Sequence, residues 1–302
     1  MTQNKTQKIS FHNLLLILSY LSIVVLAWGT NYPLIKLALR DLEPLTFSVV
    51  RLFGGTLVVF VLLKLGRAKK VLPLKEERAA LALISVLQIV SVLGLASIAL
   101  VYLPAGRTVA LIYSMPFWAA LFDMLFFKNK PRIIQSLGIL LSLLGLLVYF
   151  DPAVLAWNEK GVLLGVSITI FAALLWGIGA VLYRHYNFQT PLLNQTLWQL
   201  GVAALVMLFF AWLLEFPSRY QITPRIILIL VWNWCVPTAL AVWSWTKLLN
   251  FLPGAIAGQL LMSTPFVGIA FSALIFGESL PPVFAISTIL ISLGGAFSLM
   301  RK

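Results

Sequence analysis

Residues 103–117 read LPAGRTVALIYSMPF, and residues 252–266 read LPGAIAGQLLMSTPF. Both stretches open with Leu-Pro, close with Ser-x-Pro-Phe and separate their two prolines by twelve residues, and they lie 149 residues apart in the chain. Similarity at a fixed offset is the signature of an internal repeat, so the chain divides into two related halves.

Other motifs extend this register over nearly the whole chain, each with its internal spacing kept. The offsets between matched motifs stay between 147 and 149 residues. The matched pairs are Trp28-Gly29 (Lys36 eight after the Trp) with Trp176-Gly177 (Arg184 eight after), Pro44 and Gly54 with Pro191 and Gly201, and Leu144-Gly145 with Leu293-Gly294.

The composition assigns this repeat to a membrane. Of the 302 residues, 61% are hydrophobic and 10% are charged, and the mean hydropathy is +0.99. Soluble proteins carry about 25% charged residues, and a helical span needs about 20 apolar residues. The sequence therefore predicts an all-α membrane protein. The ten predicted spans are residues 14–35, 44–63, 79–101, 104–127, 133–150, 161–183, 191–214, 225–246, 253–276 and 282–300.

Each half holds five predicted spans, and an odd number means that the second half enters the membrane from the opposite face. We therefore expect two inverted five-helix repeats, residues 14–150 and 161–300, after an N-terminal tail of residues 1–13. Inverted repeats are typical of secondary transporters, whose site lies where the halves meet.

The basic residues give the orientation. Fifteen Lys and Arg fall on the side of the termini and six on the other side, which predicts cytoplasmic N- and C-termini and a cytoplasmic tail. We attribute the net charge of +13 to this topology, not to nucleic-acid binding. No small-residue cleavage site follows the first apolar stretch, so we expect a retained span in a bacterial inner membrane.

The chain resembles the EamA family of the drug/metabolite transporter superfamily in two features of its five-span units. Each unit has a Trp-Gly pair with a basic residue eight positions after the Trp. In each unit the fourth span opens after Leu-Pro and carries a second proline. The resemblance covers residues 14–300 and implies a central cavity lined by the first, third and fourth helices of each half. It implies no particular substrate. One departure is that Gly277-Glu278 matches Lys128-Asn129, so a role for an acid there does not extend to both halves.

Candidate substrate-binding residues are polar or aromatic side chains within the spans, gathered around the Trp-Gly pairs and the mid-span prolines. A proline frees a carbonyl and favours a kink. For the two Trp rings, packing between the halves is the open alternative, and for the kinks at Pro116 and Pro265 the open alternative is that they only shape the cavity. The predicted binding residues are Trp28, Asn31, Tyr32, Arg51, Gln88, Tyr113, Ser114, Trp176, Gln199, Gln259 and Ser263, with Pro33, Pro116 and Pro265 as kinks.

Arg51 and Asp123 are charged residues well inside predicted spans. Arg51 lies seven residues after Pro44, roughly 10 Å into the membrane. It is either a clamp for a carboxylate or phosphate of the substrate or a structural residue. In the structural reading its side chain binds helix-end carbonyls or snorkels to the interface. Its counterpart in the repeat is Trp198. Asp123 lies near the cytoplasmic end of its span, where we expect a solvated or Lys-paired residue and not a proton carrier.

Several kinds of chemistry lack their motifs. Cys235 is the only cysteine, and the two histidines, His12 and His185, lie outside the predicted spans. The sequence has no HExxH, GxSxG or Walker pattern, so we expect no enzyme, cofactor, metal or ATP use.

The sequence thus predicts a monomeric secondary transporter that works by alternating access and exports a small amphipathic, amino-acid-like metabolite. Its partners are this solute and the lipid bilayer. An uptake permease for a nutrient or cofactor, a lipid scramblase or receptor and, last, an intramembrane hydrolase stay open as alternatives.

Overall fold

The computed structural model describes residues 11–67, 71–129, 132–150, 157–251, 260–277 and 283–299. These residues form helices, and the only strand-like pairing among them is one antiparallel bridge between Leu42 and Tyr220. The helices are α1 (Phe11–Gly29), α2 (Asn31–Ala38), α3 (Pro44–Leu65), η1 (Lys75–Glu77), α4 (Arg78–Ser85), η2 (Val86–Leu95), α5 (Ala96–Tyr102), α6 (Ala105–Ile112), α7 (Met115–Phe127), α8 (Ile133–Phe150), α9 (Val162–Tyr186), α10 (Leu192–Glu215), α11 (Pro224–Asn233), η4 (Trp234–Leu240), α12 (Ala241–Phe251), η5 (Leu261–Ser263), α14 (Thr264–Phe276) and α15 (Val283–Leu299).

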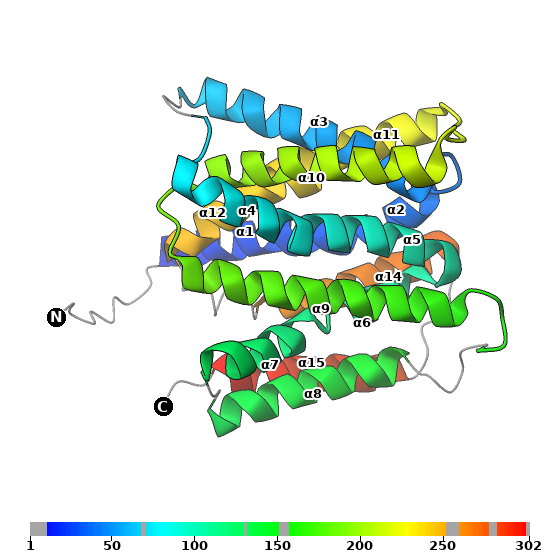
Figure 1. Cartoon of the computed structure of the whole chain (residues 1–302). Helices are drawn as coiled ribbons and strands as arrows, with labels where there is room; N and C mark the ends of the chain where they lie inside the picture. Colours follow the sequence, from blue (N-terminus) through cyan, green and yellow to red (C-terminus); the bar gives the residue numbers. More distant parts are fainter. Residues whose placement is uncertain are drawn as a thin grey trace.

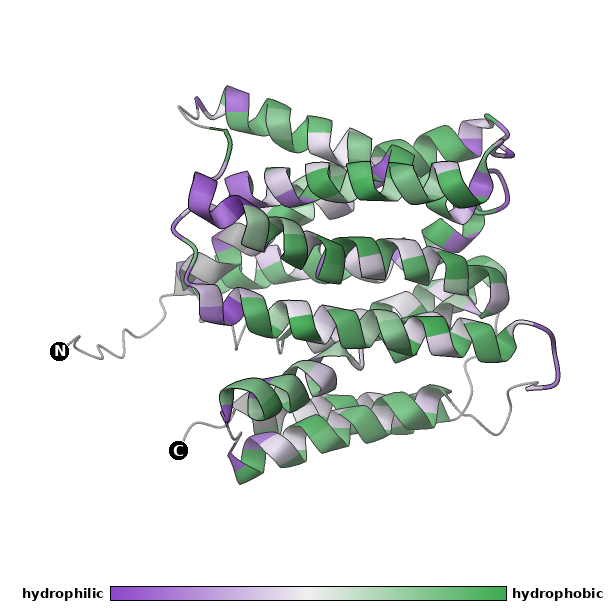
Figure 2. Cartoon of the chain, in the orientation of Figure 1, coloured by the Kyte–Doolittle hydropathy of each residue, from purple (hydrophilic) through white to green (hydrophobic). Residues whose placement is uncertain are grey.

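The chain is an all-helical membrane protein. Eight helical stretches of the described chain are long and apolar enough to cross a bilayer, and two shorter apolar helices, Thr264–Phe276 and Val283–Gly294, follow them. Figure 2 shows apolar residues along the helices and hydrophilic residues concentrated near their ends. The eight long stretches are His12–Ala38, Pro44–Leu65, Lys75–Tyr102, Ala105–Phe127, Ile133–Phe150, Val162–Tyr186, Leu192–Glu215 and Pro224–Trp245.

The helices lie side by side, and the bundle has two distinct ends (Figure 1). One end holds the last turns of α7 and α9, and we call it the Arg184 end. The opposite end holds the first turns of α3 and α11, and we call it the Arg225 end.

Three helices restart just before a proline. Backbone regularity is lost at Thr30 and at Tyr113–Ser114, and the short 3₁₀ segment η5 precedes α14. Pro33, Pro116 and Pro265 then fall in the first turns of α2, α7 and α14. A proline has no N–H and is tolerated in the first turn of a helix, where that donor would have no partner. The kinks expected at these prolines are therefore breaks.

Two π-helical segments lie at matching places in the two halves. The ten residues of η2 and the seven of η4 follow α4 and α11, and an offset of 149 residues places η4 on residues 85–91, which overlap the first part of η2. Because wider turns of this kind occur frequently at functional sites, they direct attention to the space between them.

Helices α8 and α15 pack antiparallel through reciprocal contacts. A Cβ on Gly145 would lie 2.7 Å from Ile291 Cγ1 and 2.8 Å from the Ser287 carbonyl oxygen, and a Cβ on Gly294 would meet Ser142 and the Gly138 carbonyl. Each contact maps onto the other by the offset of 149 residues, as a two-fold relation between the two helices requires.

The glycines of the two Trp-Gly pairs make a second reciprocal contact. Gly29 of α1 lies against Val267 of α14, where a Cβ would be 2.7 Å from the valine Cβ. Gly177 of α9 lies against Trp118 of α7, where a Cβ would be 2.9 Å from the tryptophan Cβ. Each contact joins one half of the chain to the other, and the small residues allow this close approach.

We predict that Gly145→Ala destabilises the protein by about 1–3 kcal/mol, because the new methyl group overlaps the backbone oxygen of Ser287. The measurement is the unfolding midpoint of the purified protein in detergent. Gly201→Ala is the matched control, since the nearest atom to a Cβ there is 3.9 Å away and alanine favours helix. Equal midpoints for the two variants would contradict the close packing of α8 on α15.

Candidate functional site

A cavity of about 760 Å³ lies between helices of both halves. Its wall is formed by side chains from α1 and α2, α3, η2, α7, α9, η4 and α12, so the two π-helical segments face the same space. Most of this wall is apolar and aromatic, with a few polar groups, which is the composition of a small-molecule site.

The structure brings most of the predicted binding residues together on this wall. The predicted residues that line the cavity are Trp28, Asn31, Tyr32, Arg51, Gln88, Tyr113, Pro116 and Trp176. Gln259 lies outside the described residues, and Pro33 and Pro265 are buried away from the lining. Contact of the lining residues with a substrate stays a prediction.

The remaining predicted residues lie outside the lining of this cavity. Ser114 Oγ donates to the Leu111 carbonyl at 2.7 Å and accepts from Trp118 Nε1 at 3.1 Å. Ser263 Oγ likewise donates to the Leu260 carbonyl at 2.8 Å, and Gln199 is outside the lining. A serine beside a helix break bonds readily to a carbonyl three residues earlier, so a similar depth in the membrane does not turn its hydroxyl to the cavity.

Pro237, Thr238 and Trp245 of the second half also line the cavity, although they were not among the residues predicted from the sequence. Trp28 Nε1 donates to the Pro237 carbonyl at 3.0 Å, and the Trp28 and Trp245 rings lie 6.1 Å apart. A proline inside the apolar eighth span was the available signal, because it disrupts the regular helix and exposes backbone carbonyls.

Arg51 lies at the centre of a polar network deep in the bundle. It is 7% exposed, and with the Asn31 amide oriented to satisfy its neighbours, Asn31 Oδ1 accepts from both terminal nitrogens of Arg51, at 2.9 and 3.3 Å. Asn31 Nδ2 then donates to Asn233 Oδ1 at 2.8 Å, and Asn233 Nδ2 donates to the Ile229 carbonyl at 2.9 Å. The network joins α2, α3 and α11.

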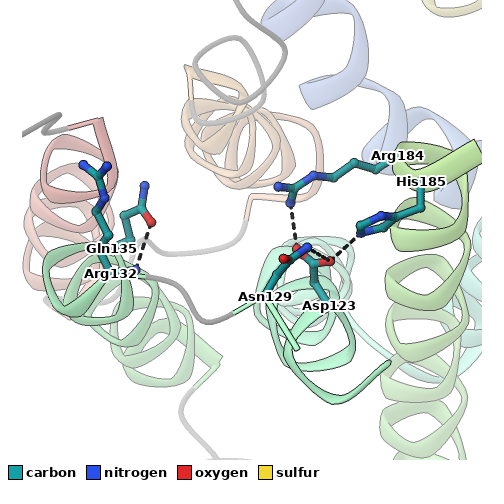
Figure 3. A network of polar contacts seen from close by, with 6 residues as sticks. All are labelled: Asp123, Asn129, Arg132, Gln135, Arg184 and His185. Atoms are coloured by element: carbon teal, nitrogen blue, oxygen red, sulfur yellow. Dashed lines mark hydrogen bonds and ion pairs between the residues drawn. The ribbon is translucent and has the colours of Figure 1, made fainter. Parts of the chain in front are cut away.

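At the Arg184 end, the cavity wall includes an ionic cluster from α7 and α9 (Figure 3). Asp123 accepts from Arg184 Nη1 at 2.8 Å, contacts His185 Nε2 at 2.8 Å and accepts from Asn129 Nδ2 at 3.2 Å. The His185 ring stacks on Phe127 with 3.6 Å between centroids. The Arg184 side chain is 68% exposed, so the cavity reaches the surface here.

This cluster corrects two expectations. Asp123 is neither solvated nor paired with a lysine, since it is 6% exposed and its cationic partner is Arg184. His185 does not lie outside the spans, because α9 continues to Tyr186 and includes it. His12, too, lies inside the stretch His12–Ala38.

Toward the Arg225 end, packed side chains close the cavity. Ile35 lines the cavity and also belongs to a cluster with Phe47, Leu100, Ile226 and other residues that are at most 5% exposed. This cluster joins α2, α3, α5 and α11, so apolar packing separates the cavity from this end.

Polar contacts hold the same end together beyond that cluster. Asp41, with a side chain 1% exposed, accepts from Arg225 Nε at 2.8 Å and from its Nη2 at 2.6 Å. Glu215 at the end of α10 accepts from the backbone N–H groups of Leu45 and Thr46, both at 2.7 Å, and so provides partners for the free donors at the start of α3.

The protein is a multi-pass helical membrane protein, and its central cavity reaches the surface at one end and is closed by packing at the other. This is the architecture of a solute carrier. The sequence profile of the EamA-like transporter family matches residues 15–150 and 163–300. The chain belongs to the EamA-like transporter family, a group within the drug/metabolite transporter superfamily, and is a multi-pass protein of the bacterial inner membrane.

Curated relatives are similar over most of their length. An uncharacterized transporter of Bacillus subtilis, YoaV, is 26% identical over 271 residues, which cover 90% of this chain and 92% of the relative. A protein of Salmonella typhimurium named a probable amino-acid metabolite efflux pump is 25% identical over 281 residues, covering 90% and 91%. A crystal structure at 18% identity superposes with a TM-score of 0.71 over 94% of this chain and 96% of that one, which shows the shared fold.

We predict a pH dependence for the Arg225 end. The two hydrogen bonds from Arg225 lower the pKa of the Asp41 carboxyl below its usual value. A lowered pKa means that the pair stabilises the folded protein fully above the unfolded value of about 3.9 and that this contribution is lost as the pH falls through the folded pKa. Melting of wild type and Asp41→Asn between pH 7 and 3 measures it: the two midpoints should differ most at pH 7 and converge at low pH. A constant difference over this range would contradict the role of the charged pair.

We also predict that Asp123 and Arg184 are energetically coupled. Asp123→Asn should lower the stability, and Arg184→Gln added to it should cost little more because the pair is already broken. Since Arg184 is largely exposed, the expected coupling energy is about 1 kcal/mol. A double-mutant cycle of unfolding in detergent gives this quantity, and additive losses would show that the ion pair contributes no stability.

Proposed function

We propose that this protein is a secondary, ATP-independent transporter that exports a small amphipathic, amino-acid-like metabolite by alternating access. The observation that carries the proposal is the 760 Å³ cavity lined by both halves, reaching the surface at Arg184 and closed by packing at the other end. The chemistry needs no catalytic group, cofactor or metal, and the transporter acts as a monomer.

In this proposal the ten predicted spans form two inverted five-helix repeats, residues 14–150 and 161–300. Two observations support the inversion: the antiparallel, reciprocal contacts of α8 with α15 and the matching contacts of Gly29 and Gly177 across the halves. A two-fold relation between halves provides two conformations of similar energy in which one site faces opposite sides.

The termini are cytoplasmic in this scheme, as the excess of basic residues on their side indicates. The Arg184 end is then cytoplasmic, and the described conformation faces inward. For the outward-facing state, the helices that meet in the apolar cluster around Phe47 have to separate, and the Arg184 end has to close over the cavity.

The substrate class and the direction follow from the wall and from the names of relatives. Aromatic rings from Trp28, Trp176 and Trp245 and neutral polar groups such as Gln88 suit a solute with an apolar body and a polar head. Two relatives at 24% and 25% identity are named probable amino-acid metabolite efflux pumps, which supports export of such a solute.

The test is counterflow in proteoliposomes loaded with a pool of amino acids and related metabolites, with exchange measured by mass spectrometry against protein-free vesicles. Exchange of one class of solute is the expected result. If the folded protein exchanges no member of the pool, the proposal is wrong, and translocation of labelled lipids is then the assay for a scramblase.

Within this assay we predict that Trp176→Ala slows exchange about 3- to 10-fold, because a ring contact with the solute of about 0.5–1.5 kcal/mol is lost. Expression, membrane insertion and melting should stay near wild type. Trp212→Ala is the control, since Trp212 is 62% exposed on α10 and lies outside the cavity. Similar rates for both variants would mean that Trp176 serves packing.

A further inference from the structure

Arg51 leaves part of its hydrogen-bonding capacity unused. The side chain is 7% exposed and lies on the cavity wall, and its contacts with Asn31 Oδ1 involve the two terminal nitrogens. Its buried Nε has no hydrogen-bond partner among the described residues. A guanidinium offers five N–H donors, and an amide oxygen brings no compensating charge.

Four buried or half-buried carboxylates of the described chain have partners other than Arg51. Asp41 pairs with Arg225, Glu77 accepts from backbone N–H groups that precede α10, Glu215 accepts from those that begin α3, and Asp123 pairs with Arg184. The other described acids lie outside the cavity lining: Glu43, Glu76 and Glu159.

The charged lining of the cavity therefore has a simple balance. Asp123 and Arg184 neutralise each other at one end, and Arg51 remains as a single positive charge deep in the wall. A buried charge without an opposite charge is costly in a low-dielectric interior, and an incoming anion relieves this cost. One net positive charge matches a monoanion better than a phosphate dianion.

We propose that Arg51 binds the carboxylate of the transported solute, so that the carrier selects organic monocarboxylates with an apolar or aromatic body. This inference rests on the proposed function and names its substrate class more closely. A guanidinium can bind a carboxylate through two parallel hydrogen bonds. Asn31, fixed by Asn233, orients the guanidinium and leaves N–H donors of the guanidinium without a partner among the described residues, while Trp28, Tyr32 and Trp176 contact the body of the solute.

The structural alternatives for Arg51 do not match its contacts. A residue bound to helix-end carbonyls would donate to backbone oxygens, but the described partner of Arg51 is the Asn31 side chain. A snorkelling side chain would be exposed at its tip, but Arg51 is 93% buried, as its 7% exposure shows.

The experiment uses four solutes with the same aromatic body as competitors of the pool exchange described above: phenylalanine, 3-phenylpropionate, phenylalanine amide and phenethylamine. The two carboxylates should inhibit the wild-type protein, and the amide and the amine should not. Equal inhibition by all four, stronger inhibition by the amine, or no inhibition by any while exchange proceeds would overturn the inference and leave the proposed function standing. Failure of the wild type to exchange any pool member would instead refute the proposed function itself.

Variants then assign the selectivity to Arg51. In Arg51→Gln, inhibition by the carboxylates should weaken about 10- to 100-fold, as expected for the loss of charge-assisted hydrogen bonds. Arg51→Lys keeps the charge without the two-pronged geometry and should fall between this variant and wild type. Arg107→Gln removes a positive charge from α6 outside the cavity and should leave inhibition unchanged.

Asn31→Asp separates ligand binding from a structural role, even if Arg51→Gln does not fold. It places a carboxylate beside the guanidinium. If Arg51 were purely structural, this carboxylate would satisfy it, and the carrier would still recognise carboxylate solutes. If Arg51 binds the solute, the protein should stay folded, with a melting midpoint at or above that of wild type, while inhibition by carboxylates weakens as in Arg51→Gln. Full inhibition by carboxylates in folded Asn31→Asp would overturn the proposal.

Discussion

In the hydrocarbon core of a bilayer, each backbone N–H and C=O needs a partner within the protein, and the architecture of this carrier depends on that constraint. Irregular backbone is tolerated there only where protein or a cavity provides the partners. The breaks before Pro33 and Pro116 and the two π-helical segments all lie beside the central cavity. The freed groups are used there: the Pro237 carbonyl accepts from Trp28, and the Asn233 carbonyl accepts from Thr238 Oγ1 at 2.8 Å.

The two halves share backbone geometry, but they differ in chemistry. Lys128 and Gly277, 149 residues apart, both end their helices with positive φ angles of 57° and 65°. A lysine adopts this conformation at a cost that glycine avoids, so the backbone has kept its shape where the residue changed. In contrast, Arg51 matches Trp198, whose Nε1 donates to the Arg78 carbonyl at 3.0 Å. One half therefore supplies the deep charge of the cavity wall, and the other half has a tryptophan at the matching position.

Stability and transport place opposite demands on the two ends of the bundle. At the Arg225 end, Asp41 and Glu215 join elements from both halves and seal the cavity with the apolar cluster beneath them. At the Arg184 end, the Asp123–Arg184 pair joins α7 to α9 beside the cavity, and buried Glu77 accepts from the backbone N–H groups of Gln189 and Thr190. Under the alternating access proposed above, the packing at the Arg225 end has to open when the Arg184 end closes.

The sequence by itself determined the fold class, the repeat register and several polar and aromatic residues of the cavity wall, because hydropathy and proline spacing reflect the local needs of helices in lipid. It also indicated the family through the Trp-Gly pairs. Only the tertiary structure decided which polar groups face the cavity, because depth in the membrane is set by position along a helix but facing is set by its rotation against its neighbours. For this reason Trp176 and Ser114 were equal candidates in the sequence, but only the tryptophan lines the cavity. For the same reason the sequence could not indicate the partners of Asp123 and Arg51, which come from other helices.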